Sequence, residues 1–239
     1  MCPRDLPRPA NRPVLELGGF TPLSTTDWPG KLAAVAFVQG CPWRCTYCHN
    51  PALQPRGVGN GPPWAEVMKT LQRRVGLLDG VVFSGGEPTL DPALPEAVQQ
   101  VRALGLQVGL HTAGIYPERL VALLPKLDWV GLDLKTEFER YDELTGRGQG
   151  GQAVRASLRH LLASGVPYEI RTTYHPALLA DPALQSIGRL LKAQGATSWV
   201  LQRWRPHEGA EPALAEAWHW PAPELLQALR ANMPALALR

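Results

Sequence analysis

The sequence predicts an α/β fold: a partial barrel of six parallel strands, each followed by a helix. Short apolar runs recur along the chain and are apolar at nearly every position, as in strands buried on both faces of a parallel sheet. A segment with helical periodicity follows each run, which is the order of repeated βα units. Six units are fewer than the eight of a closed (β/α) barrel, so an open or partial barrel is favoured.

The individual elements can be assigned in chain order. The apolar runs, each expected to form a strand, are Leu32–Gln39, Val81–Ser84, Gln107–His111, Trp129–Leu134, Tyr168–Thr173 and Trp199–Gln202. The helical segments are about 64–75, 94–104, 117–124, 152–164, 183–194 and 223–231. Several of them open at proline and close near glycine. This is typical of helices, because proline fits the first turn and glycine readily adopts the left-handed backbone conformation of the residue that follows the last turn.

The segments around these units complete the predicted organisation. Residues 1–13 are expected to be a disordered tail, and residues 14–239 a single domain. Within that domain we expect a hairpin or loop at 14–30, the barrel core at 31–206 and a helical extension at 207–239. The glycine-rich stretch 146–151 lies between two helical segments rather than after a strand, so we expect a flexible surface loop there instead of a phosphate-binding loop.

Composition excludes several classes of protein. Of 239 residues, 45% are hydrophobic and 19% charged, which is ordinary for a globular chain. The net charge of +3 is too small to indicate a nucleic-acid surface. No apolar run approaches the ~18 residues that span a bilayer. The first thirteen residues carry prolines and charges where a signal peptide needs an apolar stretch. We therefore expect a cytoplasmic protein without a membrane or nucleic-acid partner.

The cysteines are the most informative residues. Cys41, Cys45 and Cys48 have the spacing C-x3-C-x2-C directly after the first predicted strand, whereas Cys2 stands alone near the N-terminus. Three thiolates on one loop can hold three corners of an iron–sulfur cube, whose fourth iron then stays open. Zinc would need a fourth ligand, and the adjacent His49 is too close in sequence to Cys48 for a usual zinc site. Three buried structural cysteines are a further alternative.

At these residues the chain resembles a known family. The run QGCPWRCTYCHNP at 39–51 resembles the radical S-adenosylmethionine (SAM) superfamily, and in particular its glycyl-radical-enzyme activases. The resemblance covers about residues 15–210. It includes the segments Asp27–Lys31, Ser84–Thr89, Asp133–Lys135, Tyr141–Gly146, Arg171–Thr173 and Leu201–Pro206. It is greatest to the short activating proteins of anaerobic ribonucleoside-triphosphate reductases.

The resemblance implies the roles of individual residues. Cys41, Cys45 and Cys48 would ligate one 4Fe-4S cluster and so carry the catalysis. The residues implied to bind SAM are Tyr47 at the adenine, Gly85, Gly86 and Glu87 at the methionine end, and Thr112, Asp133, Lys135 and Arg171. Glu87 would accept a hydrogen bond from the SAM ammonium. All these residues fall at the carboxyl ends of predicted strands, the end at which barrel enzymes place their chemistry.

One position departs from the family pattern. Related activases often carry Asp-Thr-Asn-Gly after the third strand, and in some relatives that aspartate helps to bind a monovalent cation beside SAM. This chain has His111-Thr112-Ala113-Gly114. Imidazole is a poor ligand for hard cations, which puts a cation site in doubt. Two interpretations stay open: His111 is a satisfied histidine at a strand end, or it donates to SAM directly. Trp204 is a candidate for flanking the substrate groove, and Trp218 and Trp220 for covering the barrel edge.

The activity implied by the resemblance is radical activation of a partner enzyme. One electron from the reduced cluster would split SAM into methionine and a 5′-deoxyadenosyl radical. That radical would remove a hydrogen from a glycine loop of an anaerobic ribonucleotide reductase. Because four cysteines leave none for a second cluster, the electron would come from an external flavodoxin or ferredoxin. The alternatives are a radical SAM enzyme acting on a small molecule, such as a 7-carboxy-7-deazaguanine synthase, and a zinc-stabilised binding module.

Overall fold

A single sheet organises the molecule. The computed structural model describes residues 14–45, 47–206 and 218–239. Eight strands are hydrogen-bonded in chain order. They are β1 (Leu17–Ser24), β2 (Ala33–Val38), β3 (Gly80–Gly85), β4 (Gln107–Thr112), β5 (Trp129–Asp133), β6 (Tyr168–Tyr174), β7 (Trp199–Arg203) and β8 (Leu236–Leu238). All neighbouring pairs from β2 to β8 are parallel. The outermost strands β1 and β8 do not pair with each other, so the barrel is partial, as predicted.

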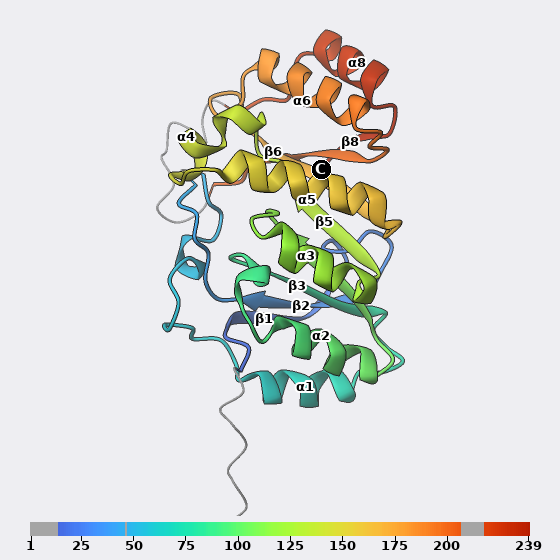
Figure 1. Cartoon of the computed structure of the whole chain (residues 1–239). Coiled ribbons are helices and arrows are strands. Elements are labelled where there is room, and N and C mark those ends of the chain that lie inside the picture. Colours follow the sequence, from blue (N-terminus) through green and yellow to red (C-terminus); the bar gives the residue numbers. More distant parts are fainter. Residues whose placement is uncertain (1–13, 46, 207–217) are drawn as a thin grey trace, which may run out of the picture.

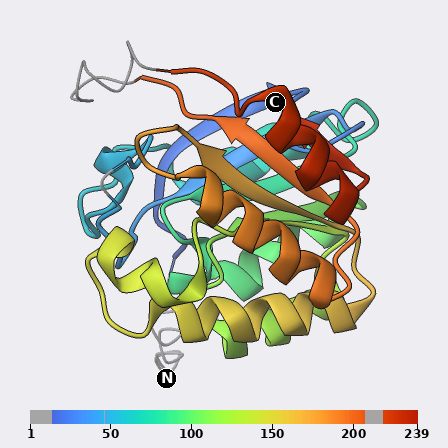
Figure 2. The same cartoon turned by 90° about the horizontal axis from the view of Figure 1, so that it is seen from above.

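The longer helices cover one face of this sheet. They are α1 (Trp64–Gln72), α2 (Leu94–Ala103), α3 (Pro117–Leu123), α5 (Gly150–Ser164), α6 (Asp181–Ala193) and α8 (Pro223–Asn232). Figure 1 shows them stacked in chain order in front of the strands, and Figure 2 shows the same layers from above. A short helix, α4 (Tyr141–Thr145), lies between β5 and α5. None of the helices among the described residues is long and apolar enough to cross a membrane.

The alternation of side chains along the strands separates two cores. In β2, Ala34, Ala36 and Val38 belong to the large core that also contains the helices, while Ala33 and Val35 belong to a small cluster. Two tryptophans dominate the small cluster, because Trp28 stacks on Trp129 with ring centroids 5.8 Å apart. Trp129 is the first residue of β5, and the Trp28 ring lies against Gly80, the first residue of β3. This small cluster therefore fills the interior on the side of the sheet away from the helices, near the start of these strands.

The structure confirms the six predicted strands and adds two. β1, in the segment expected to form a hairpin or loop, pairs antiparallel with β2. β8 pairs parallel with β7, so the C-terminal segment that we expected to be only helical also contains a strand. The three residues of β8 are too few to show a periodic pattern. The positions 1–13 and 207–217, including the predicted tail and Cys2, lie outside the described residues.

The expectation of a flexible loop at 146–151 is wrong for its second half. Gly150 and Gly151 are buried and form the first turn of α5. A Cβ atom added to Gly151 would lie 1.8 Å from the carbonyl oxygen of Phe138, so only glycine lets the helix start this close to the preceding segment. Gly146, in left-handed conformation, ends α4. The glycines therefore serve a tight connection between two helices, which composition alone does not distinguish from a surface loop.

Candidate active site

The loop after β2 is fastened to the segment between α4 and α5. The backbone nitrogen of Arg44 donates to the Thr145 oxygen at 2.9 Å, and its guanidinium donates to the Cys41 oxygen at 2.8 Å. Arg147 donates to the Pro42 oxygen at 3.1 Å. Trp43 is buried, with its ring centroid 5.7 Å from that of Tyr141. The segment Tyr141–Gly146, which belongs to the resemblance, is therefore the outer support of the cysteine loop.

The carboxyl ends of the strands surround a cavity of about 260 Å³, which we call the cysteine cavity. It brings together ten of the eleven site residues that we predicted. They are Cys41, Cys45, Tyr47, Cys48, Gly85, Gly86, Thr112, Asp133, Lys135 and Arg171. Residues that we had not assigned to SAM also line it, among them Trp43, Asn50, Gln54, Thr173 and Gln202. Thr173 and Gln202 are late strand residues, so their position near the carboxyl ends was a signal that could have identified them.

The three thiols occupy the wall of this cavity and are each half-buried. Burial raises the pKa of Cys41 to about 12, and burial also raises the pKa of Cys45. Ligation by a metal would deprotonate these thiols, because the thiolate is the form that binds. No three His, Cys, Asp or Glu side chains in the described ranges converge around one point as ligands of a single metal ion do. All three thiols nevertheless line the same cavity.

Gly86 lets the turn after β3 lie against the start of the cysteine loop. A Cβ atom added to Gly86 would lie 2.3 Å from the oxygen of Gly40, the residue before Cys41. The Glu87 nitrogen donates to the same oxygen at 2.8 Å. Gly85 has a φ of +115°, a backbone conformation that glycine adopts without strain. The two glycines therefore bring bare backbone to the cavity surface, where a ligand can approach it closely.

Glu87 lies behind this surface and does not line the cavity. Its side chain is fully buried, and this burial raises the pKa of its carboxyl group above the usual value. The side chain accepts hydrogen bonds from the nitrogen and hydroxyl of Thr89, from the Thr112 hydroxyl and from the Ala113 nitrogen. Through these hydrogen bonds Glu87 ties the turn after β3 to the end of β4. Its direct contact with the SAM ammonium stays a prediction.

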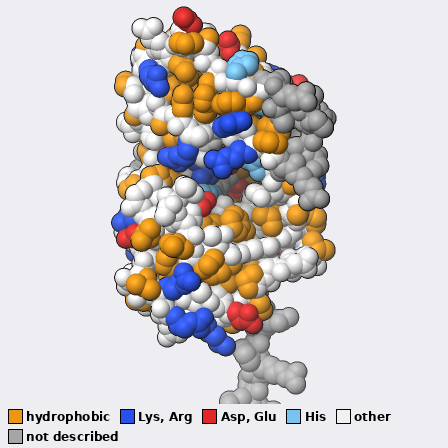
Figure 3. Space-filling view, turned by 180° about the vertical axis from the view of Figure 1, so that it is seen from behind, with side chains coloured by type: hydrophobic (Ala, Val, Ile, Leu, Met, Phe, Trp, Pro, Cys, Tyr) orange, Lys and Arg blue, Asp and Glu red, His pale blue; other side chains and the backbone are white. Residues whose placement is uncertain are grey.

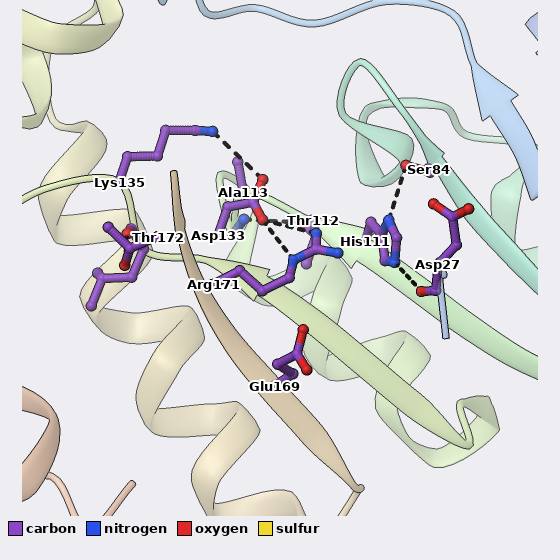
Figure 4. A network of polar contacts seen from close by, with 12 residues as sticks. Asp27, Ser84, His111, Thr112, Ala113, Asp133, Lys135, Glu169, Arg171 and Thr172 are labelled. Atoms are coloured by element: carbon purple, nitrogen blue, oxygen red, sulfur yellow. Dashed lines mark hydrogen bonds and ion pairs between the residues drawn. The ribbon is translucent and has the colours of Figure 1, made fainter. Parts of the chain in front are cut away.

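Three charged side chains lie together across β5 and β6. The Arg171 guanidinium donates to one oxygen of Asp133 at 3.0 and 2.8 Å, and the Lys135 ammonium lies 3.6 Å from the other (Figure 4). Burial acts to raise the pKa of Asp133, but Arg171 and Lys135 outweigh it and hold the pKa below its usual value. Arg171 thus has the anionic partner that its place inside an apolar strand requires.

His111 uses both of its ring nitrogens within the protein. Nε2 lies 2.7 Å from the backbone oxygen of Asp27, and Nδ1 lies 3.1 Å from the Ser84 hydroxyl (Figure 4). A carbonyl oxygen can only accept, so Nε2 carries the proton and Nδ1 accepts from Ser84. Burial lowers the pKa of His111 to about 3, which keeps the ring neutral. Of the two interpretations left open by the sequence, the satisfied histidine agrees with this geometry.

Tyr47 is held between the cysteines and the charged group. Its ring is buried, and the Lys135 ammonium lies 5.8 Å from the ring centroid. Its hydroxyl is buried without a hydrogen-bond partner among the described residues. A buried hydroxyl without a partner is costly, so an acceptor or donor from a bound molecule is expected at this position.

The tryptophans near the C-terminal end pack against β6 and β7. Trp204 is buried, with its ring centroid 5.4 Å from that of His175 and 6.3 Å from that of His49. Its role in flanking the substrate groove stays a prediction. Trp220 stacks on Tyr174 of β6 at 6.3 Å, and Trp218 carries the Arg203 guanidinium on its ring at 4.0 Å. Trp218 and Trp220 thus pack against the last residues of these strands. That they cover the barrel edge stays a prediction.

The residues of the cysteine cavity fit an iron–sulfur cluster and SAM. Three sulfur ligands are the donor set that such clusters take, and three leave one iron open. The unpartnered Tyr47 hydroxyl and the bare backbone of Gly85 and Gly86 supply places for a second, partly polar molecule. Charges of both signs, on Lys135 and Asp133, face the same space, as a zwitterionic amino acid group requires.

Comparison with known proteins agrees with this assignment. Residues 35–183, more than half of the chain, match the radical SAM superfamily. The chain is 28% identical over 199 residues to MJ1227 of Methanocaldococcus jannaschii. That relative is named as a glycyl-radical enzyme activating enzyme. That similarity covers 80% of this chain and 81% of the relative. The pyruvate formate-lyase-activating enzyme of Clostridium pasteurianum is 34% identical over 135 residues, 54% of this chain and 56% of the relative.

Solved structures share the fold. Streptococcus suis SuiB bound to S-adenosylmethionine superposes with a TM-score of 0.63 at 15% identity, over 84% of this chain and 48% of that chain. The fold and the cysteine cavity define an α/β enzyme of the kind that holds an iron–sulfur cluster beside SAM. The chain belongs to the radical SAM superfamily. Its cofactors are a 4Fe-4S cluster and SAM, and a zinc-stabilised binding module is no longer a suitable description.

Proposed function

We propose that this protein is an activating enzyme that generates a glycyl radical on a partner enzyme, and that the partner is an anaerobic ribonucleoside-triphosphate reductase. The observation that carries the proposal is the cysteine cavity, in which three thiols and the SAM-binding candidates meet at the carboxyl ends of the strands. The similarity to two relatives that are named as activating enzymes supports it. The choice of reductase rests on the resemblance of the sequence motifs.

In this proposal each part of the cavity has a separate task. Cys41, Cys45 and Cys48 hold the cluster, with the loop kept in place by Arg44 and Arg147. The cluster, when bound, supplies the one electron that splits SAM into methionine and a 5′-deoxyadenosyl radical. The chain's remaining task is to orient SAM and to keep water away.

Four groups orient SAM in this proposal. Gly85 and Gly86 offer backbone to its methionine end, and Tyr47 packs against its adenine. Lys135 attracts its carboxylate. Asp133 keeps its charge beside Arg171 and is available to the ribose hydroxyls. Thr112 lines the same wall, with its hydroxyl donating to Glu87.

A peptide loop suits the open side of the sheet. Because β1 and β8 do not pair, the wall of the barrel is incomplete beside the cysteine cavity. A glycine in a flexible loop can be inserted through such an opening, and its Cα hydrogen is then within reach of the radical. The electron would come from a separate flavodoxin or ferredoxin, since the three cluster cysteines and Cys2 leave no ligand set for a second cluster.

The test is direct transfer of the radical. The anaerobically reconstituted protein is mixed with SAM, a strong reductant and an anaerobic ribonucleotide reductase, preferably from the same organism. We expect a doublet in the electron paramagnetic resonance spectrum, and its loss when the partner's glycine is replaced by alanine. The protein with Cys45→Ala serves as the negative control. If 5′-deoxyadenosine forms but no reductase acquires the radical, the small-molecule alternative replaces the activase proposal.

A further inference from the structure

A second cavity opens beside the cysteine cavity, at the carboxyl ends of β6 and β7. Its volume is about 440 Å³, and four arginines contribute to its wall: Arg171, Arg203, Arg205 and Arg239. Asp27 is the one acidic residue of the described chain in that wall. We call it the arginine cavity. Figure 3 shows Lys and Arg side chains gathered across the middle of this face, next to a hollow with His and acidic side chains.

Two of the four arginines are neutralised by acidic partners. Arg171 donates twice to Asp133. Arg239 makes a two-pronged pair with the buried Glu169, at 2.9 and 3.0 Å. These two side chains therefore shape the wall without adding net charge to it. The remaining two, Arg203 and Arg205, make no ion pair with any described residue, and His111 at the same wall is neutral. The described part of the wall thus holds two arginines without a carboxylate partner, together with one acidic residue, Asp27.

Both unpaired arginines lie where β7 leaves the sheet. Arg203 is the last residue of β7 and Arg205 lies two residues beyond it, and both line the cavity. Trp204, between them, is buried. The Arg203 guanidinium lies over the Trp218 ring, 4.0 Å from its centroid. Both arginine side chains are exposed, so their donors are accessible to a ligand.

The arginine cavity continues into the cysteine cavity. Asp27, His49, Asn50, His111, Arg171 and Gln202 line both. A molecule that places one group beside the cluster and SAM can therefore place a neighbouring group between Arg203 and Arg205. The planar guanidinium fork matches carboxylate and phosphate groups, since it donates two parallel hydrogen bonds to an oxyanion.

We propose that the arginine cavity binds a carboxylate of the substrate: an acidic side chain on the partner's loop, a few residues from the glycine that loses its hydrogen. This inference rests on the proposed function for the identity of the substrate. The same carboxylate chemistry would be offered by a small-molecule acid if the proposed function is wrong. The binding site itself is assigned from the two unpaired arginines and the continuity of the two cavities.

The test measures binding and does not need radical transfer. The reconstituted protein with SAM is titrated anaerobically with two capped glycine-containing peptides that differ only in glutamate or glutamine beside the glycine. Succinate is the small carboxylate probe. We expect the glutamate peptide to bind about tenfold more tightly than the glutamine peptide, as a charge-assisted contact at an exposed site allows, and succinate to displace it.

Variants of the arginines separate the possible outcomes. The double variant Arg203→Gln, Arg205→Gln should abolish the preference for the glutamate peptide. The double variant Arg203→Lys, Arg205→Lys should keep part of that preference. Arg189→Gln is the matched control, because Arg189 is an exposed arginine in the second half of α6, toward the amino end of β7.

Equal preference for the glutamate peptide in the glutamine double variant and in the original protein would refute the site. Succinate binding that needs both arginines, without any peptide preference, would refute the loop as its source. Failure of radical transfer with intact glutamate preference would refute only the proposed function.

Discussion

Replacing Arg171 by glutamine tests the charged group of the cysteine cavity. The substitution removes two hydrogen bonds to Asp133, at 3.0 and 2.8 Å. Arg171 is buried, but the Asp133 side chain is 33% exposed and keeps Lys135 at 3.6 Å. Loss of one partner costs about 3–5 kcal/mol in a fully buried pair and about 0.2–1 kcal/mol in an exposed one. We expect an intermediate loss of about 1–3 kcal/mol in the free energy of unfolding.

The same substitution changes the pH dependence of stability. In the folded protein the pKa of Asp133 lies below its usual value, so the unfolded chain binds more protons. The stabilisation is therefore present at neutral pH and is lost as the pH falls below about 4, through the folded-state pKa. In Arg171→Gln the pKa of Asp133 rises, and this acid-dependent part of the stability shrinks. Urea denaturation of the reduced apoprotein at several pH values measures both effects.

A double-mutant cycle isolates the pair. Asp133→Asn is combined with Arg171→Gln, and we expect a coupling energy of about 1–2 kcal/mol at neutral pH. The reasoning is refuted if Arg171→Gln changes stability by less than about 0.5 kcal/mol and the two substitutions are additive.

Three further predictions concern other parts of the site. His111→Gln should flatten the pH dependence of stability between about pH 6.5 and 3. Because the folded-state pKa of His111 lies near 3, its protonation lowers the free energy of unfolding of the original protein by up to about 4 kcal/mol as the pH falls over that range. An acid denaturation curve of His111→Gln that matches that of the original protein would contradict this. Gly86→Ala would bring a methyl group to 2.3 Å from the Gly40 oxygen and displace the cysteine loop, so iron content after reconstitution should fall, whereas Gly148→Ala, with its nearest contact at 3.9 Å, should leave it unchanged. Cys45→Ala should lose iron, while Cys2→Ala should retain about four irons per chain, and equal losses would contradict a three-cysteine site.

The positions of the strands could be predicted because each is a short apolar run followed by a helical segment. Once the strands are known, their parallel order places the carboxyl ends together. Cys41, Gly85, Asp133 and Arg171 therefore meet in one cavity, as the sequence predicted. The pairing of Arg171 with Asp133 also follows from the strand register, since the two residues are direct partners across β5 and β6.

The direction of individual side chains could not be predicted. Glu87 stands in a turn, where neither alternation nor helical periodicity tells which way a carboxylate points, and the structure directs it to Thr89, Thr112 and Ala113. His111 bonds to Asp27 and Ser84, which are 84 and 27 residues away in sequence. Such contacts depend on the assembled sheet, and no local pattern encodes them.

Cleavage of SAM tests the central claim, that the cysteine cavity is the site of radical SAM chemistry, most directly. The reconstituted protein is incubated anaerobically with SAM and dithionite, and 5′-deoxyadenosine and methionine are quantified by chromatography. We predict equal amounts of the two products from the original protein and from Arg189→Gln, and none from Cys45→Ala. A protein with an intact, reducible cluster that forms no 5′-deoxyadenosine would contradict the account, as would equal yields from Cys45→Ala.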